Sequence, residues 1–405
     1  MIPERAASRE CGVLVCGGGV AGVAAAVSAA RRGSRVVLIE QGRQLGGIGT
    51  HGLLRTICGL YLNGDNAPTE TLNKGIVRDI VSGLQAMAPH RAVRKAGRVF
   101  VMPYADGDLL TILGSLCKQE AGLEVLLRTR VVSALARNGQ LDEVVTEGNE
   151  AIRFRPQAVI DATGSGEIGF LAGAGFDLAE GEQRQMAGYI VRIQGLTFLD
   201  GLELKVPYVL AGVTDSRASS SLRFTTFTPG DEPGEGYLKF NSTGPEGTER
   251  DRQMETDVAV ALETLAARLP AFRHAAIASR SDAVMDREGR RLRGEYVLTE
   301  EDVVSARKFP DAAARNAWPI ELWKGQQGTV YRYLPKGEYY EIPFRSLVVK
   351  GFGNLLVVGR CISASHEAQG SVRVMGCCMA TGDAAGRAAA ALVKNGAYGD
   401  YRLNK

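Results

Sequence analysis

The sequence predicts an α/β fold in which a Rossmann-type dinucleotide-binding domain with a parallel sheet is assembled from the two ends of the chain and carries an inserted α+β domain. Three observations predict this architecture. A strand–turn–helix–strand pattern with a glycine-rich turn occupies residues 11–40. A second apolar run with a sharp turn at its end lies at residues 158–169, and a third, followed by small residues, lies at residues 354–396. Strand ends of this kind face a bound nucleotide in doubly wound sheets.

The middle of the chain differs in its sequence pattern from the two ends. From about Gln185 to Phe344, short strand-like runs alternate with turn clusters, and the first glycine pattern does not recur. We therefore expect residues 1–184 and 346–405 to form the nucleotide-binding domain and residues 185–345 to form a substrate domain. With 405 residues, the chain also exceeds one typical hydrophobic core.

Composition excludes several classes of protein. With 45% hydrophobic and 23% charged residues the chain is ordinary and globular, and a formal charge of +3 without a basic run gives no reason to expect a nucleic-acid partner. We expect no membrane span and no signal peptide, and therefore a cytoplasmic protein. Seven cysteines without CxxC spacing argue against a disulfide framework, a zinc site or an iron–sulfur cluster, and we expect no metal.

The first element is a βαβ unit that binds a dinucleotide. Gly17 allows the tight turn, Gly19 lets the backbone approach a pyrophosphate, and Gly22 lets the helix pack close to the strands. Phosphates are expected at the helix N-terminus. Glu40, at the end of the second strand, is expected to accept hydrogen bonds from a ribose and to disfavour a 2′-phosphate. The predicted binding residues here are Gly17, Gly19, Val20, Ala21, Gly22, Glu40 and Gln41.

A second glycine-rich loop, GRQLGGIGTHG, follows the βαβ unit. With that unit, it resembles the FAD-dependent oxidoreductases related to glutathione reductase and the fumarate reductase flavoproteins, in which a GGxGT loop passes beside the flavin. The resemblance implies that the cofactor is FAD. It also implies that His51 and Arg55 lie near the isoalloxazine, and that the flavin and pyrophosphate are covered by Gly46, Gly47, Gly49 and Thr50.

Two local patterns follow. Asp108 predicts an N-cap for a helix that runs to Glu120. Alternating apolar residues on both sides of Asn138-Gly139 predict a β-hairpin. The resemblance implies a β-meander here, with the backbone around Val131 contacting the adenine.

The motif AVIDATGSGEIG, at residues 158–169, predicts a buried strand that ends on Asp161 and turns sharply through Ala162, Thr163 and Gly164. It is similar to the VIDATGdgd motif of the same family. The resemblance implies that these three turn residues contact the cofactor.

In the middle of the chain, the patterns predict strands at residues 186–193, 206–213, 222–227 and 237–240. The segment DREGRRLRGEYVLTEEDV has two interpretations. One is a charged, solvated face. The other is a resemblance to the family's REsRRivGeyvLteeDv segment, with Arg287, Arg290 and Arg291 on matching positions and Gly289 where the family has Ser.

The last motif lies at residues 354–396. A buried strand runs into Gly359 and Arg360, and small residues predict a helix that begins near Ser371 and packs very closely against another element. This segment resembles the family's last FAD motif. The resemblance implies that Gly359 and Arg360 hold the pyrophosphate, and that a helix N-terminus from Val372 points at the flavin. The predicted binding residues of this helix start are Gly370, Ser371 and Val372.

Flavin chemistry needs a base and an anchor for the substrate. Of four histidines, His51 and His366 lie in flavin motifs and are the candidates for proton transfer. Arg55 and Arg373 are candidates for holding an anionic substrate, and facing the flavin pyrimidine is the alternative for Arg373. Attachment of FAD through His51 or Cys58 is a further alternative.

The expected function is oxidation of a small organic substrate by hydride transfer to flavin N5, with electrons passed to oxygen, a quinone or another carrier. No second GxGxxG pattern provides an NAD(P)H domain. An NAD(P)H-using flavin monooxygenase, and a flavin-binding subunit or non-redox flavoenzyme, are the alternatives. The sequence identifies neither the substrate nor the electron acceptor.

Overall fold

A seven-stranded sheet forms the centre of the protein in the computed structural model, which describes residues 6–325 and 327–399. The strand order is β6-β2-β1-β9-β8-β7, and β20 pairs with the last part of β9. The strands are β1 (Ala7–Cys16), β2 (Val36–Ile39), β6 (Leu123–Leu126), β7 (Arg130–Arg137), β8 (Gln140–Glu147), β9 (Ile152–Asp161) and β20 (Leu355–Val357). Because β6, β2, β1, β9 and β20 pair in parallel, their carboxyl ends meet at one edge.

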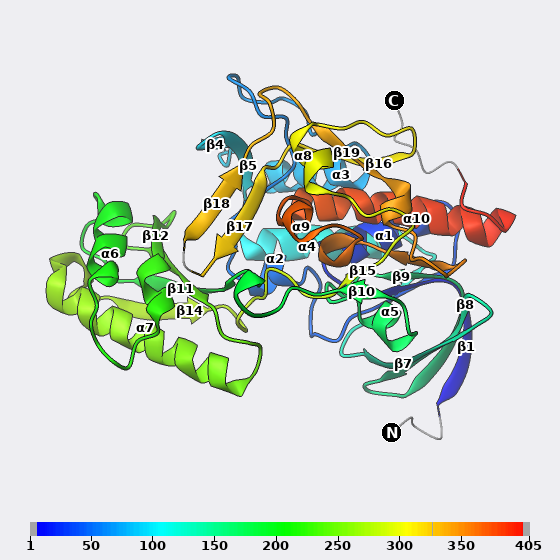
Figure 1. Ribbon diagram of the computed structural model, residues 1–405, viewed down its shortest axis with the longest axis horizontal. Coiled ribbons are helices and arrows are strands. Elements are labelled where there is room, and N and C mark those ends of the chain that lie inside the picture. Colours follow the sequence, from blue (N-terminus) through cyan, green and yellow to red (C-terminus); the bar gives the residue numbers. More distant parts are fainter. Residues whose placement is uncertain (1–5, 326, 400–405) are drawn as a thin grey trace.

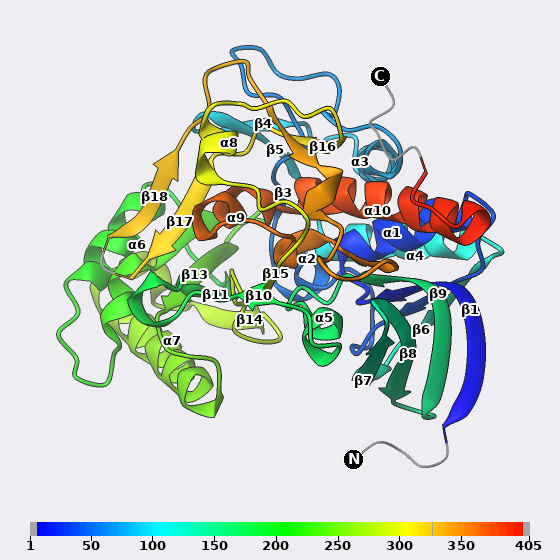
Figure 2. The same cartoon turned by 45° about the vertical axis from the view of Figure 1, so that its right-hand side comes forward.

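Helices cover one face of this sheet (Figure 2). They are α1 (Val20–Ala30), α3 (Ile76–Met87), α4 (Asp106–Gln119) and α10 (Met375–Asn395). A Cβ atom added to Gly382 or Gly386 of α10 would lie 2.2 Å from the backbone oxygen of Ala21 or Ala25, respectively. The predicted close packing of the small-residue helix is therefore confirmed, and its partner is α1.

The predicted hairpin is confirmed, whereas the predicted helix cap is wrong. Asn138 and Gly139 have φ values of 51° and 73°, as a tight turn between β7 and β8 requires. Helix α4 begins at Asp106, with Ala105 as its extended N-cap residue. Asp108 does not cap it, because its carboxylate binds Arg91.

A second unit lies at the other end of the molecule from the central sheet, on the left in Figure 1. Its antiparallel sheet has the order β12-β13-β11-β14, formed by β11 (Ala187–Gln194), β12 (Thr226–Pro229), β13 (Gly236–Ser242) and β14 (Ala276–Arg280). The helices α6 (Leu202–Ala211) and α7 (Thr248–Arg268) cover it, and these elements share a hydrophobic cluster of their own.

Two predicted strands of this unit are wrong in whole or in part. Residues 206–211 belong to helix α6, because Leu202, Val206 and Leu210 repeat every four residues and are all buried. The run 222–227 divides into a 3₁₀ turn at Ser220–Phe224 and strand β12. The predictions for β11 and β13 are confirmed.

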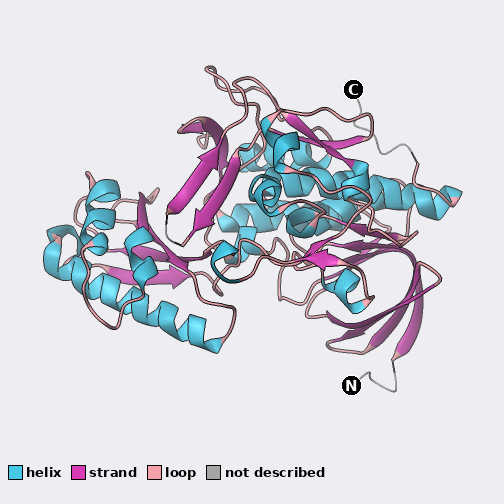
Figure 3. Cartoon of the chain, viewed as in Figure 1, coloured by secondary structure: helices cyan, strands magenta, loops and turns pink. Residues whose placement is uncertain are grey.

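Shorter elements make up the rest of the structure, and among them the hairpin of β17 and β18 lies above the sheet of the second unit (Figure 3). They are α2 (Ile48–His51), β3 (Thr56–Ile57), β4 (Arg94–Ala96), β5 (Val99–Pro103), α5 (Glu167–Leu171), β10 (Phe176–Asp177), β15 (Arg291–Leu292), α8 (Glu300–Val304), β16 (Ala312–Asn316), β17 (Ile320–Lys324), β18 (Gly328–Arg332), β19 (Tyr340–Pro343) and α9 (His366–Val372). Within the described residues, no helix is both long enough and apolar enough to cross a membrane.

Candidate functional site

The three predicted glycine turns meet at the carboxyl edge of the central sheet. Gly17 follows β1 with a φ of 109°, and a Cβ atom there would lie 2.4 Å from the carbonyl oxygen of Ala162, which follows β9. Gly359 follows β20, and its added Cβ would lie 3.2 Å from the Cβ of Ala21. Segments more than 300 residues apart in sequence therefore line one crevice, which is where doubly wound sheets bind nucleotides.

The turn before α1 has the shape that a pyrophosphate needs. A Cβ atom on Gly22 would lie only 1.8 Å from the carbonyl oxygen of Gly17, so helix and turn touch directly. A Cβ on Gly19 would meet no described atom within 4 Å, so space is open in front of the α1 N-terminus, where Val20 and Ala21 begin the helix. Backbone N–H groups and the helix dipole favour an anion at such a place.

Glu40 shapes this turn. Its carboxylate accepts hydrogen bonds from the backbone N–H groups of Gly18 and Gly42, both at 2.6 Å. Gln41 beside it is exposed. The Thr129 N–H donates to the Glu40 carbonyl at 2.9 Å, which brings the start of β7, with Val131, next to Glu40. The predicted ribose and adenine contacts therefore lie on neighbouring segments, although the Glu40 carboxylate already has two donors.

The Asp161 carboxylate stabilises the second turn by accepting hydrogen bonds from the residues that follow β9. It is fully buried, and its oxygens accept hydrogen bonds from the Thr163 hydroxyl (2.6 Å) and from the Ile168 N–H (2.9 Å). Burial raises the pKa of Asp161, while these hydrogen bonds oppose the rise. Because the Thr163 hydroxyl is used in this way, the Thr163 and Gly164 backbone is what the turn offers to a ligand.

Arg360 connects this turn to the segment that follows β14. Its Nε donates to the carbonyl oxygen of Gly164 at 2.7 Å, and its Nη1 donates to the carbonyl oxygen of Asp286. Burial lowers the pKa of its guanidinium. Arg360, which is predicted to bind the pyrophosphate, thus connects two loops in this structure through its hydrogen bonds.

The GGxGT loop lies against the first turn. The Gly46 N–H donates to the Gly18 carbonyl at 2.8 Å, and the added Cβ of Gly47 would lie 3.2 Å from the Gly19 Cα. The Thr50 hydroxyl donates inward to the carbonyl of Leu45 at 2.7 Å. Gly49 accepts a hydrogen bond from the Tyr104 hydroxyl at 2.6 Å. The loop backbone, and not the Thr50 side chain, therefore faces the crevice.

His51 and Arg55 face the inserted unit. The Nδ1 atom of His51 lies 2.7 Å from an oxygen of Asp282, a side chain that is 72% exposed. The guanidinium of Arg55 pairs with Asp231 and lies 4.6 Å from the ring centroid of Tyr237. Both residues therefore help to join the two units.

The predicted start of the last helix is wrong. Two helices are present, α9 and α10, because Val374 adopts an extended conformation and interrupts the helical run. The hydroxyl of Ser371 bonds to the Trp318 carbonyl and the Tyr340 hydroxyl, both at 2.6 Å. Gly370 and Val372 are also buried. The N-terminus of the long helix is thus at Met375, and Ser371 packs against β16 and β19.

His366, the first residue of α9, contacts a buried carboxylate that the sequence analysis did not identify. Its Nδ1 lies 3.0 Å from Oε2 of Glu288, whose side chain has no exposed surface. Glu288 also accepts hydrogen bonds from the N–H and the side-chain amide of Gln185, both at 3.2 Å. Burial alone would raise the pKa of Glu288, but the contact with His366 and the Gln185 bonds hold it below its usual value.

A cationic cluster lies at the other end of α9. We define it as Lys239 of β13, Arg287 and Arg373, which surround Trp323 and Glu321 of β17. The Lys239 Nζ and the Arg287 Cζ lie 4.1 Å and 4.0 Å from the Trp323 ring centroid. The Nη2 of Arg373 lies 3.9 Å from Oε2 of Glu321. Of this cluster the sequence analysis identified Arg373 as a site residue.

The first part of the segment with three arginines, residues 286–292, is buried or half-buried, so the interpretation as a solvated face is wrong there, whereas Arg293, Glu295 and Val297 further along are exposed. Arg287 and Arg291 are 9% and 6% exposed. Arg287 donates to Asn241, Arg290 to Ser165, and Arg291 to Ala364. The segment therefore ties the inserted unit to the turn after β9 and to the loop before α9. Glu288 lies inside this motif, which is the signal by which it was recognisable in sequence.

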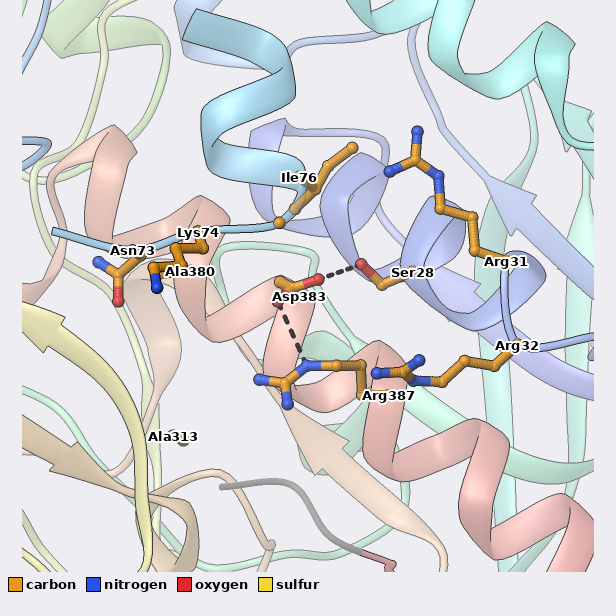
Figure 4. Close-up of a pocket in the computed structure, with 11 residues that line it drawn as sticks. Ser28, Arg31, Arg32, Asn73, Lys74, Ile76, Ala313, Ala380, Asp383 and Arg387 are labelled. Carbon is orange, nitrogen blue, oxygen red and sulfur yellow. Dashed lines mark hydrogen bonds and ion pairs between the residues drawn. The ribbon is translucent and has the colours of Figure 1, made fainter. Parts of the chain in front are cut away.

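A cavity of about 190 Å³ lies elsewhere, between α1, α3 and α10 (Figure 4). Its wall includes Asp383, which accepts a hydrogen bond from Ser28 and pairs with Arg387 at 3.3 Å. None of the crevice glycines Gly17, Gly19 and Gly359 lines this cavity, so the cavity is separate from the crevice at the sheet edge.

The fold and the crevice define a Rossmann-type protein that binds a dinucleotide. The family model for FAD dependent oxidoreductases matches residues 12–399, so the chain belongs to that family. It is an oxidoreductase, and its cofactor is FAD. The open space at Gly19 fits the pyrophosphate of that cofactor.

Among solved structures, the chain is similar to a geranylgeranyl bacteriochlorophyll reductase-like protein from Thermoplasma acidophilum (14% identity, TM-score 0.48, covering 97% of this chain and 80% of the other). It is also similar to p-nitrophenol 4-monooxygenase from Pseudomonas putida (13% identity, TM-score 0.47, covering 96% and 81%). No curated protein matches the chain at a significant level. Similarities this distant carry no information about the substrate.

Proposed function

We propose that this protein oxidises a small organic substrate and passes the electrons to oxygen, a quinone or another carrier, as a cytoplasmic dehydrogenase or oxidase. We also propose that it belongs with the flavoproteins related to glutathione reductase and fumarate reductase. The observation that supports the proposal most is a contact of His366, the first residue of the short helix α9 that leads to α10. This histidine lies against the buried carboxylate of Glu288.

The proposal assigns proton transfer to His366. FAD, when bound, accepts two electrons as a hydride from a substrate C–H bond. A proton must leave the neighbouring O–H or N–H at the same time. Nδ1 of His366 lies 3.0 Å from the Glu288 carboxylate, although it makes no hydrogen bond in this geometry. A small rotation of the imidazole would let an Nδ1–H group donate to Glu288, and the lone pair of Nε2 would then be free to accept that proton. The same carboxylate then stabilises the imidazolium.

His51 is the weaker of the two candidates. Its carboxylate partner, Asp282, is 72% exposed, and exposed ion pairs contribute little because water screens them. Glu288 has no exposed side-chain surface and is fixed by Gln185. A buried, fixed carboxylate orients and stabilises a histidine far better.

A network connects the base to the cationic cluster. The side-chain amide of Gln185 donates to both Glu288 (3.2 Å) and Gln369 (3.0 Å), and Gln369 donates to the carbonyl of Arg287 at 3.0 Å. These hydrogen bonds hold the base and the cations in a fixed arrangement, as a site that orients its substrate requires.

The test is anaerobic mixing of the FAD-loaded protein with alcohols, amines and hydroxy acids, with the flavin absorbance at about 450 nm as the readout. Bleaching by an organic donor is expected, and His366→Asn should slow it by about 100-fold or more while FAD is retained. His90→Asn, which changes an exposed histidine, is the matched control. Bleaching by NADH or NADPH alone would contradict the proposal and favour a monooxygenase, and bleaching by none of these would favour a flavin-binding subunit.

A further inference from the structure

We propose that the substrate carries an anionic group, a carboxylate or a phosphate, and that this group binds to Lys239 and Arg373 beside Trp323, with Arg287 behind them. This inference rests on the proposed function, because it specifies the substrate of the same site. The observations that support this inference do not depend on which histidine is the base. They are the geometry of the cationic cluster, its charge balance and its unused hydrogen-bond donors.

The geometry brings together three cations from distant parts of the chain. Lys239 lies on β13 of the inserted unit, Arg287 follows β14, and Arg373 ends α9. The ring of Trp323 holds the first two at 4.1 Å and 4.0 Å from its centroid. Because like charges repel strongly where water is scarce, this arrangement costs free energy unless an anion joins it.

The protein supplies too little negative charge. Glu321 is the carboxylate that faces all three cations in the part of the chain that the structure describes. Its oxygens already accept hydrogen bonds from the indole N–H groups of Trp318 (3.2 Å) and Trp323 (3.0 Å) and from the Tyr331 hydroxyl (3.2 Å). Glu288, the acidic residue that follows Arg287 in the sequence, pairs with His366. A net positive charge therefore remains.

Several donors of the cluster have no acceptor among the described residues. The Lys239 ammonium makes no hydrogen bond or ion pair among these residues, and it lies over the Trp323 ring. The Nε of Arg373 is buried and has no hydrogen-bond partner there. Arg287 donates to two uncharged oxygens, the Met186 carbonyl and the Asn241 side chain. An anion between Lys239 and Arg373 would satisfy the first two.

Ionisation behaviour agrees with this charge balance. Burial, with the charges of Arg287 and Arg373, lowers the pKa of Lys239 to about 7, although Glu321 and the Cys58 thiol oppose the fall. Burial and Arg373 lower the pKa of Arg287 to about 9, against Glu321 and Tyr331. A bound anion would reverse both shifts, so its binding should take up a proton near neutral pH.

The test measures binding to the FAD-loaded protein. Benzoate is the carboxylate probe, phenyl phosphate is the phosphate probe, and benzamide is the uncharged control. The readouts are tryptophan fluorescence and the change in the flavin spectrum. We expect benzoate, phenyl phosphate or both to bind and benzamide to bind at least about tenfold more weakly, because a charge-assisted hydrogen bond is lost. Which anion binds more tightly identifies the source of the anionic group.

Three variants make the test specific. Lys239→Met should weaken binding of the preferred anion by about tenfold or more, with FAD content unchanged. Lys350→Met, at an exposed lysine, should leave it unchanged. Benzoate affinity should fall as pH rises through about 7, where Lys239 loses its proton, and Lys239→Arg should bind benzoate without this pH dependence.

Equal binding of benzamide, unchanged affinity in Lys239→Met, or no binding of either anion would overturn the inference. Anion binding without bleaching by any donor would remove the proposed function and leave the anion site. Bleaching by uncharged donors without anion binding would do the reverse.

Discussion

Replacing Gly22 by alanine tests the packing that creates the nucleotide crevice. The added Cβ would lie 1.8 Å from the Gly17 carbonyl oxygen and 3.1 Å from the Cβ of Ala162. A normal contact is near 3.5 Å, so α1 and the turn must separate by about 1.7 Å. Backbone lies on both sides of this contact, and no side chain can rotate away. We expect a loss of about 1–3 kcal/mol in the free energy of unfolding and a large loss of FAD affinity.

Gly114→Ala is the matched control for this substitution. Gly114 also lies inside a helix, α4, but its added Cβ would meet no described atom within 4 Å. Alanine there should raise the free energy of unfolding by about 0.5–1 kcal/mol, because it is the better helix former. Denaturant titration and the ratio of flavin to protein absorbance measure both variants. A Gly22→Ala protein that keeps its FAD and its stability would refute the reasoning.

Three further predictions concern the site. Glu288→Gln should lower the rate of substrate oxidation by about 10- to 100-fold with FAD content unchanged, because the imidazolium loses its carboxylate. An unchanged rate would argue against this pairing. His51→Asn should change the rate by less than about threefold, since its pair with Asp282 is exposed, and a loss comparable with that of His366→Asn would reverse the assignment of the base. Burial lowers the pKa of Lys239 below the usual lysine value, to about 7. Between these two pKa values the native protein binds fewer protons than the unfolded chain, so the stability of the protein rises with pH. Lys239→Met should therefore raise the melting temperature more at pH 6 than at pH 9, and thermal unfolding at the two pH values checks this.

The sequence predicted the crevice well because its determinants are local. Gly17, Ala162 and Gly359 each follow an apolar run directly, and parallel strands bring their carboxyl ends together. The prediction of a strand at residues 206–213 is wrong, and Pro207 lies within α6 although proline disfavours a helix interior. There, burial of Leu202 and Leu210 outweighs the local preference.

The cationic cluster could not be predicted in the same way. Lys239, Glu321 and Arg373 come from β13, β17 and the end of α9, and no local spacing connects them. Their roles depend on burial and on which side chains lack partners, and both are properties of the folded chain. Ser371 differs from these residues, because the sequence did predict it as a site residue. The resemblance implies that Ser371 lies beside the flavin, and in the structure its hydroxyl is hydrogen-bonded to Trp318 and Tyr340.

The most direct measurement is a crystal structure of the FAD-loaded protein. We expect electron density for the pyrophosphate in front of Gly19 at the N-terminus of α1, and for the flavin ring within reach of His366 and the cationic cluster. Density for FAD in the cavity beside Asp383, or a flavin ring remote from His366, would contradict this expectation.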